Sequence, residues 1–127
     1  MYHYTESGLD NIWLINGYCI IVDEDYGECV SISDVTGLNR AIGHDLVFNK
    51  PSLTGAEFRF LRKELDLSQK ALADLMGKDE QSIARWEKSA KAPKYADRML
   101  RALVLDFYGE KISLLALIDR IRDIDEQ

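Results

Sequence analysis

The segment Leu67–Glu87 constrains the fold of this chain more than any other part of the sequence. Ser68 can cap a helix that ends at Gly77, and Asp79 can cap a second helix directly after it. The apolar residues expected on the core faces are Ala71, Leu72 and Leu75 in the first helix, and Ile83 and Trp86 in the second. The spacing therefore predicts two short helices joined by a tight glycine turn.

Another helix is predicted before this pair. Thr54 and Glu57 fit a capping box, in which the threonine side chain accepts a free backbone amide and the glutamate reaches back. An apolar stripe follows and ends near Asp66. The sequence therefore predicts three consecutive helices between residues 54 and 88.

Two more helices are predicted after the pair. Ala92-Pro93 marks a break before the helical run Tyr95–Phe107. Beyond Gly109, residues Ser113–Ile124 predict a final amphipathic helix. Its apolar face consists of Leu114, Leu117, Ile118, Ile121 and Ile124. This helix either packs on its own domain or pairs with a second copy, and both alternatives stay open.

The first fifty residues have an extended character. Three runs rich in β-branched and aromatic residues predict strands at Ile12–Ile15, Tyr18–Val22 and Glu28–Ile32. Asn16-Gly17 is a strong hairpin signal, and Asp23–Gly27 makes a second turn. Helical spacing predicts a short helix over 35–48, and Asn49–Ser52 is the expected linker. The residues expected to form the core of this module are Trp13, Ile15, Tyr18, Ile20 and Val22.

The net charge of −6 is unevenly distributed along the 127 residues. Residues 1–53 carry two bases against eight acids, residues 54–108 carry eleven against nine, and residues 109–127 carry three against five. The middle is therefore basic enough to approach a phosphate backbone, while a strongly basic, non-specific nucleic-acid binder is excluded.

Composition and the chain's first residues exclude several other classes. No apolar run approaches the length of a membrane span, and the first ten residues do not look like a secretory signal. Two cysteines, Cys19 and Cys29, imply no disulfide framework, so we expect a cytoplasmic protein. The sequence has no Ser-His-Asp order, no glycine-rich phosphate loop and no metal-ligand spacing. We therefore expect no enzyme activity and no cofactor.

The segment Leu67–Gly77 and the following Gln81–Glu87 resemble the Xre/Cro (lambda-repressor-like) helix-turn-helix family. The shared features are a Leu-Ser-Gln helix start, the small residue Ala73, the turn glycine and a closing Ile-x-x-aromatic-Glu. The resemblance covers residues 54–108. It implies a mainly α protein, with a five-helix Xre-type domain preceded by a small α+β module. We divide the chain into an acidic module at 1–50, the DNA-binding domain at 51–108 and the C-terminal amphipathic helix at 109–127.

The resemblance also implies roles for individual residues. The helix opened by Asp79 should be the recognition helix in the major groove. Inward-facing Ile83 and Trp86 would leave the base-contacting side chains exposed, and Trp86 is expected in the core. The expected base contacts are Gln81, Ser82 and Arg85, with Glu80 as a further possibility that faces repulsion from phosphates. The expected phosphate contacts are Ser68, Gln69, Lys88, Lys91 and Lys94, where the lysines also fit an ordinary solvated surface. Arg62 and Glu87 match a structural ion pair of the family.

The order of the modules looks like that of MqsA-type antitoxin regulators, although the paired Cys-x-x-Cys zinc motifs of those proteins are missing. Cys19, Cys29, His3 and His44 are the residues that could hold zinc, and the cysteines lie in apolar runs, so we expect no metal. The resemblance implies a double-stranded DNA operator, a homodimer and a regulator of its own operon. A toxin or other protein partner would bind through residues 1–50. The alternative is that this module only stabilises or spaces the dimer.

Overall fold

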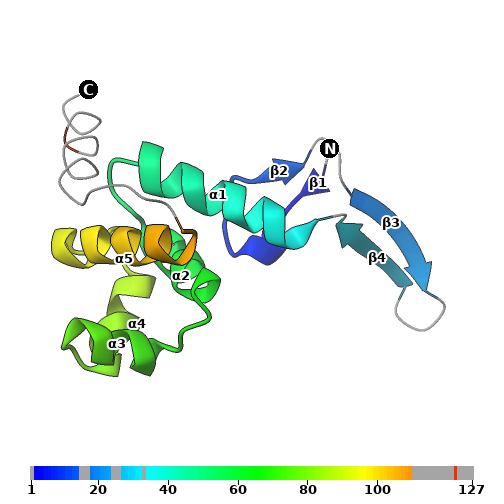
Figure 1. The fold of residues 1–127 in the computed structure, drawn as a ribbon. Helices are drawn as coiled ribbons and strands as arrows, with labels where there is room; N and C mark the ends of the chain where they lie inside the picture. Colours follow the sequence, from blue (N-terminus) through cyan, green and yellow to red (C-terminus); the bar gives the residue numbers. More distant parts are fainter. Residues whose placement is uncertain (1, 15–17, 24–26, 33, 110–121, 123–127) are drawn as a thin grey trace.

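The computed structural model describes residues 2–14, 18–23, 27–32, 34–109 and 122, with the backbone alone for 18–23 and 27–32. This part of the chain contains five α-helices (Figure 1), namely α1 (Val35–Asn49), α2 (Gly55–Glu64), α3 (Gln69–Met76), α4 (Glu80–Lys88) and α5 (Lys94–Phe107). The predicted mainly α fold is therefore confirmed. Apart from Arg122, the predicted helix Ser113–Ile124 lies outside the described residues, and α1 is the fifth helix of the described part.

Each two-stranded sheet of the N-terminal part is antiparallel. β3 (Tyr18–Asp23) pairs with β4 (Gly27–Ile32), as the acidic turn between them predicts. β2 (Trp13–Leu14) pairs instead with β1 (Tyr2–His3), which the sequence did not predict. The expected pairing of 12–15 with 18–22 is therefore wrong for Trp13–Leu14, and the Asn16-Gly17 turn lies outside the described residues.

Side-chain caps fix where the helices begin. The Thr54 hydroxyl accepts the Glu57 amide at 3.2 Å, and the Glu57 carboxylate accepts the Thr54 amide at 2.9 Å, so the predicted capping box is present. Asp34 and Asp79 accept backbone amides of the first turns of α1 and α4 in the same way. Because each cap depends on residues three positions apart, the sequence located these starts to within one residue.

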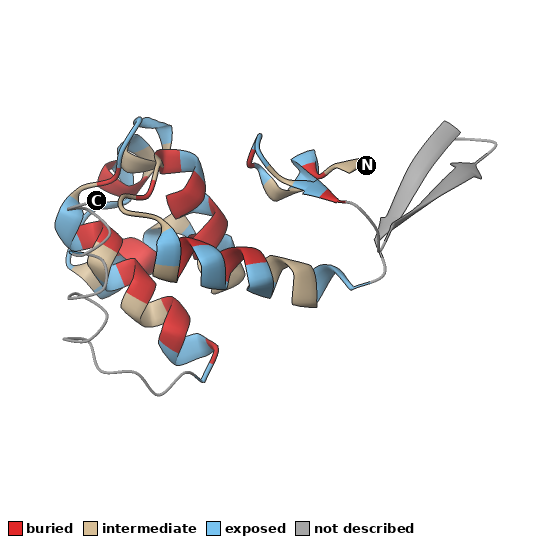
Figure 2. Ribbon diagram, turned by 90° about the horizontal axis from the view of Figure 1, so that it is seen from above, coloured by how far each residue is buried: buried red, intermediate tan, exposed pale blue. Residues whose placement is uncertain are grey.

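The buried residues gather where the five helices face one another (Figure 2). The core face of α3 is made by Leu72 and Ala73, while Leu75 is 60% exposed, contrary to the expectation. Burial on this helix is centred between Leu72 and Ala73, and Leu75 falls outside that stripe. Trp13 is 54% exposed and stacks on His3 with ring centroids 4.1 Å apart, so it is not a core residue either.

The N-terminal residues share the core of the helices. Tyr4, Leu9 and Leu14 are buried in one cluster with apolar residues of α1, α2 and α5, and the Tyr4 hydroxyl donates to the Asn39 side chain at 2.9 Å. The next residue of α1, Arg40, donates to the Tyr108 carbonyl oxygen at 2.8 Å. Helix α1 therefore joins the N-terminal segment to α2 and α5.

A buried ion pair lies beneath the junction of α1 and α2. Asp97 and Arg101 of α5 are both buried, and the Arg101 Nε donates to Asp97 at 2.5 Å. Arg101 also donates to the Val47 carbonyl oxygen at 3.0 Å, and Asp97 accepts the Leu53 amide at 2.8 Å. The pair thus satisfies backbone groups on both sides of residues 48–52 and ties this connection to α5.

Replacing Arg101 by methionine tests how much this ion pair contributes to the stability of the fold. Arg101→Met leaves the Asp97 carboxylate and the Val47 carbonyl buried without their main donor, and should lower the free energy of unfolding by about 3–5 kcal/mol. Arg98→Met is the matched control, because Arg98 donates to the same carboxylate at 3.1 Å from a partly exposed position. Its loss should cost at most about 1 kcal/mol. Equal losses in urea unfolding would contradict this assignment.

Candidate nucleic-acid interface

Helices α3 and α4 form the predicted pair around a glycine turn. Gly77 has φ +69, in the left-handed region that favours glycine, and ends α3. The following Lys78 amide donates back to the Ala73 carbonyl oxygen at 2.9 Å. Ile83 of α4 is fully buried, as the spacing predicted, and Leu72 lies in the same core. The turn and these side chains set the angle at which α4 is presented.

The other end of α4 is fixed against the start of α2. A Cβ atom built on Gly55 would lie 2.5 Å from the Ser89 carbonyl oxygen and 2.6 Å from those of Glu87 and Trp86. The Gly55 amide donates to the Ser89 oxygen at 3.2 Å. Only glycine permits this approach of the two backbones, so α4 is held at both ends.

The buried carboxylate of Glu87 accepts hydrogen bonds from side chains of two other helices. Arg62 of α2 donates from Nε to Oε2 at 2.6 Å and from Nη2 to Oε1 at 3.2 Å. The side-chain amide of Gln69, at the start of α3, donates to the same Oε1 at 3.2 Å. Arg62 further donates to the Leu67 carbonyl oxygen at 2.8 Å. The Arg62–Glu87 pair thus links α2 with α4 and orients Gln69 beside it.

The first turns of α4 carry the predicted base-contacting residues. Glu80, Gln81 and Arg85 are exposed on this helix. Ser82 is buried, contrary to the expectation that it is exposed with them. Its hydroxyl donates to Asp79 at 2.8 Å and accepts from the Arg85 guanidinium at 3.2 Å, so the serine belongs to the helix cap. The exposed polar surface of α4 is therefore narrower than predicted.

Trp86 lies at the edge of the core, on the opposite side of α4. Its ring packs edge-on against Phe58, with centroids 6.1 Å apart, and against Tyr95, with centroids 5.7 Å apart. These contacts and its partial burial make Trp86 a packing residue and not one exposed for stacking on a base. Trp86 supports the angle between α4 and α5.

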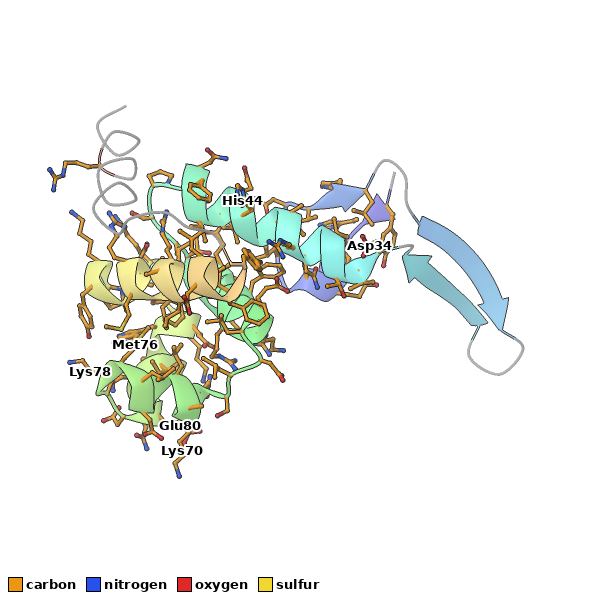
Figure 3. The ribbon with its side chains drawn as sticks, in the orientation of Figure 1. Asp34, His44, Lys70, Met76, Lys78 and Glu80 are labelled. Atoms are coloured by element: carbon orange, nitrogen blue, oxygen red, sulfur yellow. The ribbon has the colours of Figure 1, made fainter. Side chains whose placement is uncertain are left out.

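The predicted phosphate contacts surround this surface. Ser68 is exposed, and its hydroxyl oxygen accepts the Ala71 amide at 3.0 Å as the cap of α3. The exposed lysines that follow α4 are Lys88, Lys91 and Lys94. Figure 3 shows Lys70 and Glu80 at one outer edge of the α3–α4 pair, away from α1. Lys70 was not predicted, although its place two residues after the Ser68 cap is a signal that the sequence contained.

The histidines considered as metal ligands lie in separate elements. His3 stacks on Trp13 in the β1–β2 sheet, and His44 of α1 packs against Phe48, with ring centroids 4.5 Å apart. The side chains of Cys19 and Cys29 lie outside the described residues. Within the described part of the chain, no three His, Cys, Asp or Glu residues are placed to hold a metal ion. None of the helices described there is both long and apolar enough to cross a membrane.

The hydrogen bonds of the α4 cap predict a change in the pKa of Asp79 that a titration can measure. Hydrogen bonds from the Ser82 hydroxyl and amide lower the pKa of Asp79 below its usual 3.8. The cap is therefore fully formed above pH 3.8 and is lost as the pH falls through the lowered pKa of the folded state. In Ser82→Ala, the pKa of Asp79 should rise toward 3.8, which a carbon-13 NMR titration of the carboxyl group measures. The control Ser68→Ala removes the equivalent cap of α3 and should leave Asp79 unchanged. An unaltered pKa in Ser82→Ala would contradict this account.

One of three comparisons with known proteins agrees with this geometry. No curated protein and no solved structure matches the chain. A family model described as helix-turn-helix matches residues 58–103, from the first turn of α2 to the middle of α5. The MqsA-like order of modules stays a prediction. The match indicates a DNA-binding regulator, and residues 58–103 are the helix-turn-helix region of this chain.

Proposed function

We propose that the chain is a sequence-specific transcription regulator that acts in the cytoplasm and inserts the first turns of α4 into the major groove of DNA. The observation that carries this proposal is the exposure of Gln81 and Arg85 on a helix whose other side is anchored by buried Ile83. Glutamine pairs with adenine and arginine with guanine through two hydrogen bonds each. The guanidinium of Arg85 donates one hydrogen bond to Ser82, and its other N–H groups can donate to a base.

Two further residues of α4 have secondary roles. Glu80 is exposed beside Gln81, and its carboxylate accepts a hydrogen bond from cytosine N4 where the operator supplies that base. Ser82 contributes through Arg85 and Asp79, because both of its hydrogen bonds lie within α4 and its cap. It orients the arginine and does not itself reach a base.

The surrounding residues contact phosphates and set the register of the protein on the duplex. Ser68 and Gln69 lie at the amino-terminal end of α3, which favours anions. Lys88, Lys91 and Lys94 extend this contact along the backbone of the DNA. These contacts supply affinity that depends on salt and carry no sequence information.

We further propose a homodimer that represses its own operon. Helix-turn-helix proteins read two half-sites about one duplex turn apart, which requires two copies. The exposed apolar side chains Tyr95, Met99 and Phe107 of α5 offer a surface for the second copy. A consensus site with twofold symmetry would support this proposal, and a single half-site would contradict it.

The second candidate function is that of an antitoxin whose N-terminal module binds a toxin. Its support is the excess of six acids over bases in residues 1–53, which favours a basic protein partner, together with the exposed Trp13 beside His3. Aromatic residues of this kind are enriched in protein interfaces. In this case DNA binding would serve as feedback on the operon.

The test is selection of DNA sites from a random duplex library, followed by fluorescence anisotropy with the selected and a scrambled duplex. Arg85→Ala and Gln81→Ala should each weaken binding to the selected duplex by about 1–3 kcal/mol and relax the preference at one base pair. Lys88→Ala should instead weaken binding to both duplexes alike. The DNA upstream of the gene itself, tested in parallel, addresses autorepression.

Equal and weak binding of all duplexes, unaffected by either α4 variant, would overturn the proposed function. The antitoxin candidate would then be tested by mixing the chain with the product of the neighbouring gene.

A further inference from the structure

Arg59 of α2 is a cation for which the fold shows little structural use. Its Nε lies 4.0 Å from Glu87 Oε1, longer than a hydrogen bond, and its side chain is 53% exposed. Glu87 is already neutralised by Arg62, whose two donors lie at 2.6 and 3.2 Å. Among the described residues, the cluster therefore carries two arginines for one carboxylate and has a net positive charge.

The position of Arg59 connects it with the proposed DNA surface. Arg59 and Gln69 both approach Oε1 of Glu87, so their donors lie close together at the junction of α2, α3 and α4. The guanidinium also has room to turn, because Arg59, Lys63 and Glu87 line a cavity of about 380 Å³ with residues 5–8 of the N-terminal segment. The one acid that this segment adds to the lining is Glu6, whose carboxylate accepts a hydrogen bond from the Tyr2 hydroxyl. A weakly held guanidinium beside such a space suits a phosphate group, which it binds through two hydrogen bonds.

We propose that Arg59 binds a phosphate of the DNA backbone and extends the contact surface from α3 and α4 onto α2. This inference rests on the proposed function. It also assigns different tasks to the two arginines that share Glu87, since Arg62 holds the helices together and Arg59 turns outward to the DNA. The contact adds affinity without reading bases.

The experiment is a salt series of anisotropy titrations with the full chain on the selected and the scrambled duplex. In Arg59→Ala, the slope of log affinity against log salt should fall by about 1, so that a rise from 50 to 200 mM salt costs the variant about 3- to 4-fold less affinity than the wild type. Both duplexes should be affected alike. Arg59→Lys keeps the charge and should retain the slope while losing affinity.

Lys63→Ala is the matched control, because Lys63 is an exposed cation one turn further along α2 that lines the same cavity. It removes the same charge one helical turn away from Arg59 and should leave the slope unchanged. Equal changes in the two alanine variants would mean that net charge alone matters and would overturn the proposal. An unchanged slope in Arg59→Ala would overturn it as well, while the proposed function would stand if the wild type still selects its site. Thermal unfolding of each variant verifies that the fold is intact.

Discussion

The ion pair of Arg62 and Glu87 is the interaction on which the DNA-binding region depends most. A buried carboxylate costs free energy unless it is paired, and here the pairing draws α2, the start of α3 and the end of α4 to one point. The backbone contact at Gly55 lies beside it and permits no side chain. The backbone of α4 is consequently held in a rigid frame, so little backbone ordering would be needed when its exposed residues bind a partner.

A second buried pair, Asp97 and Arg101, ties α5 to the segment between α1 and α2. In both pairs the charged side chains bind backbone groups in addition to their charged partner. Each pair therefore joins chain segments that are distant in sequence. The Tyr108 hydroxyl adds a third polar contact by donating to Glu64 at 2.6 Å, and burial and this carboxylate raise the pKa of Tyr108. These polar contacts thus favour one arrangement of the helices, because another arrangement would leave the charged groups buried without their partners.

The sequence predicted what depends on neighbouring residues and missed what depends on distant ones. The caps at Thr54 and Asp79 and the turn at Gly77 are local patterns, and the structure contains all three. Leu75 and Ser82 were assigned to the wrong faces, because the buried stripe of a short helix is decided by the helices that cover it. The pairing of Trp13 with His3 could not be predicted either, since a strand of two residues has no periodic pattern.

The connection between α1 and α2 is held at both ends, at Val47 by Arg101 and at Leu53 by Asp97. This prevents the N-terminal part from behaving as a tethered module that swings freely. The β3–β4 hairpin projects from the N-terminal end of α1, away from α3 and α4 (Figure 1). A protein bound to the N-terminal residues that pack on α1 would therefore be held at a set distance and angle from α4. Whether it blocks or recruits a neighbour on the DNA would then be decided by its size and shape.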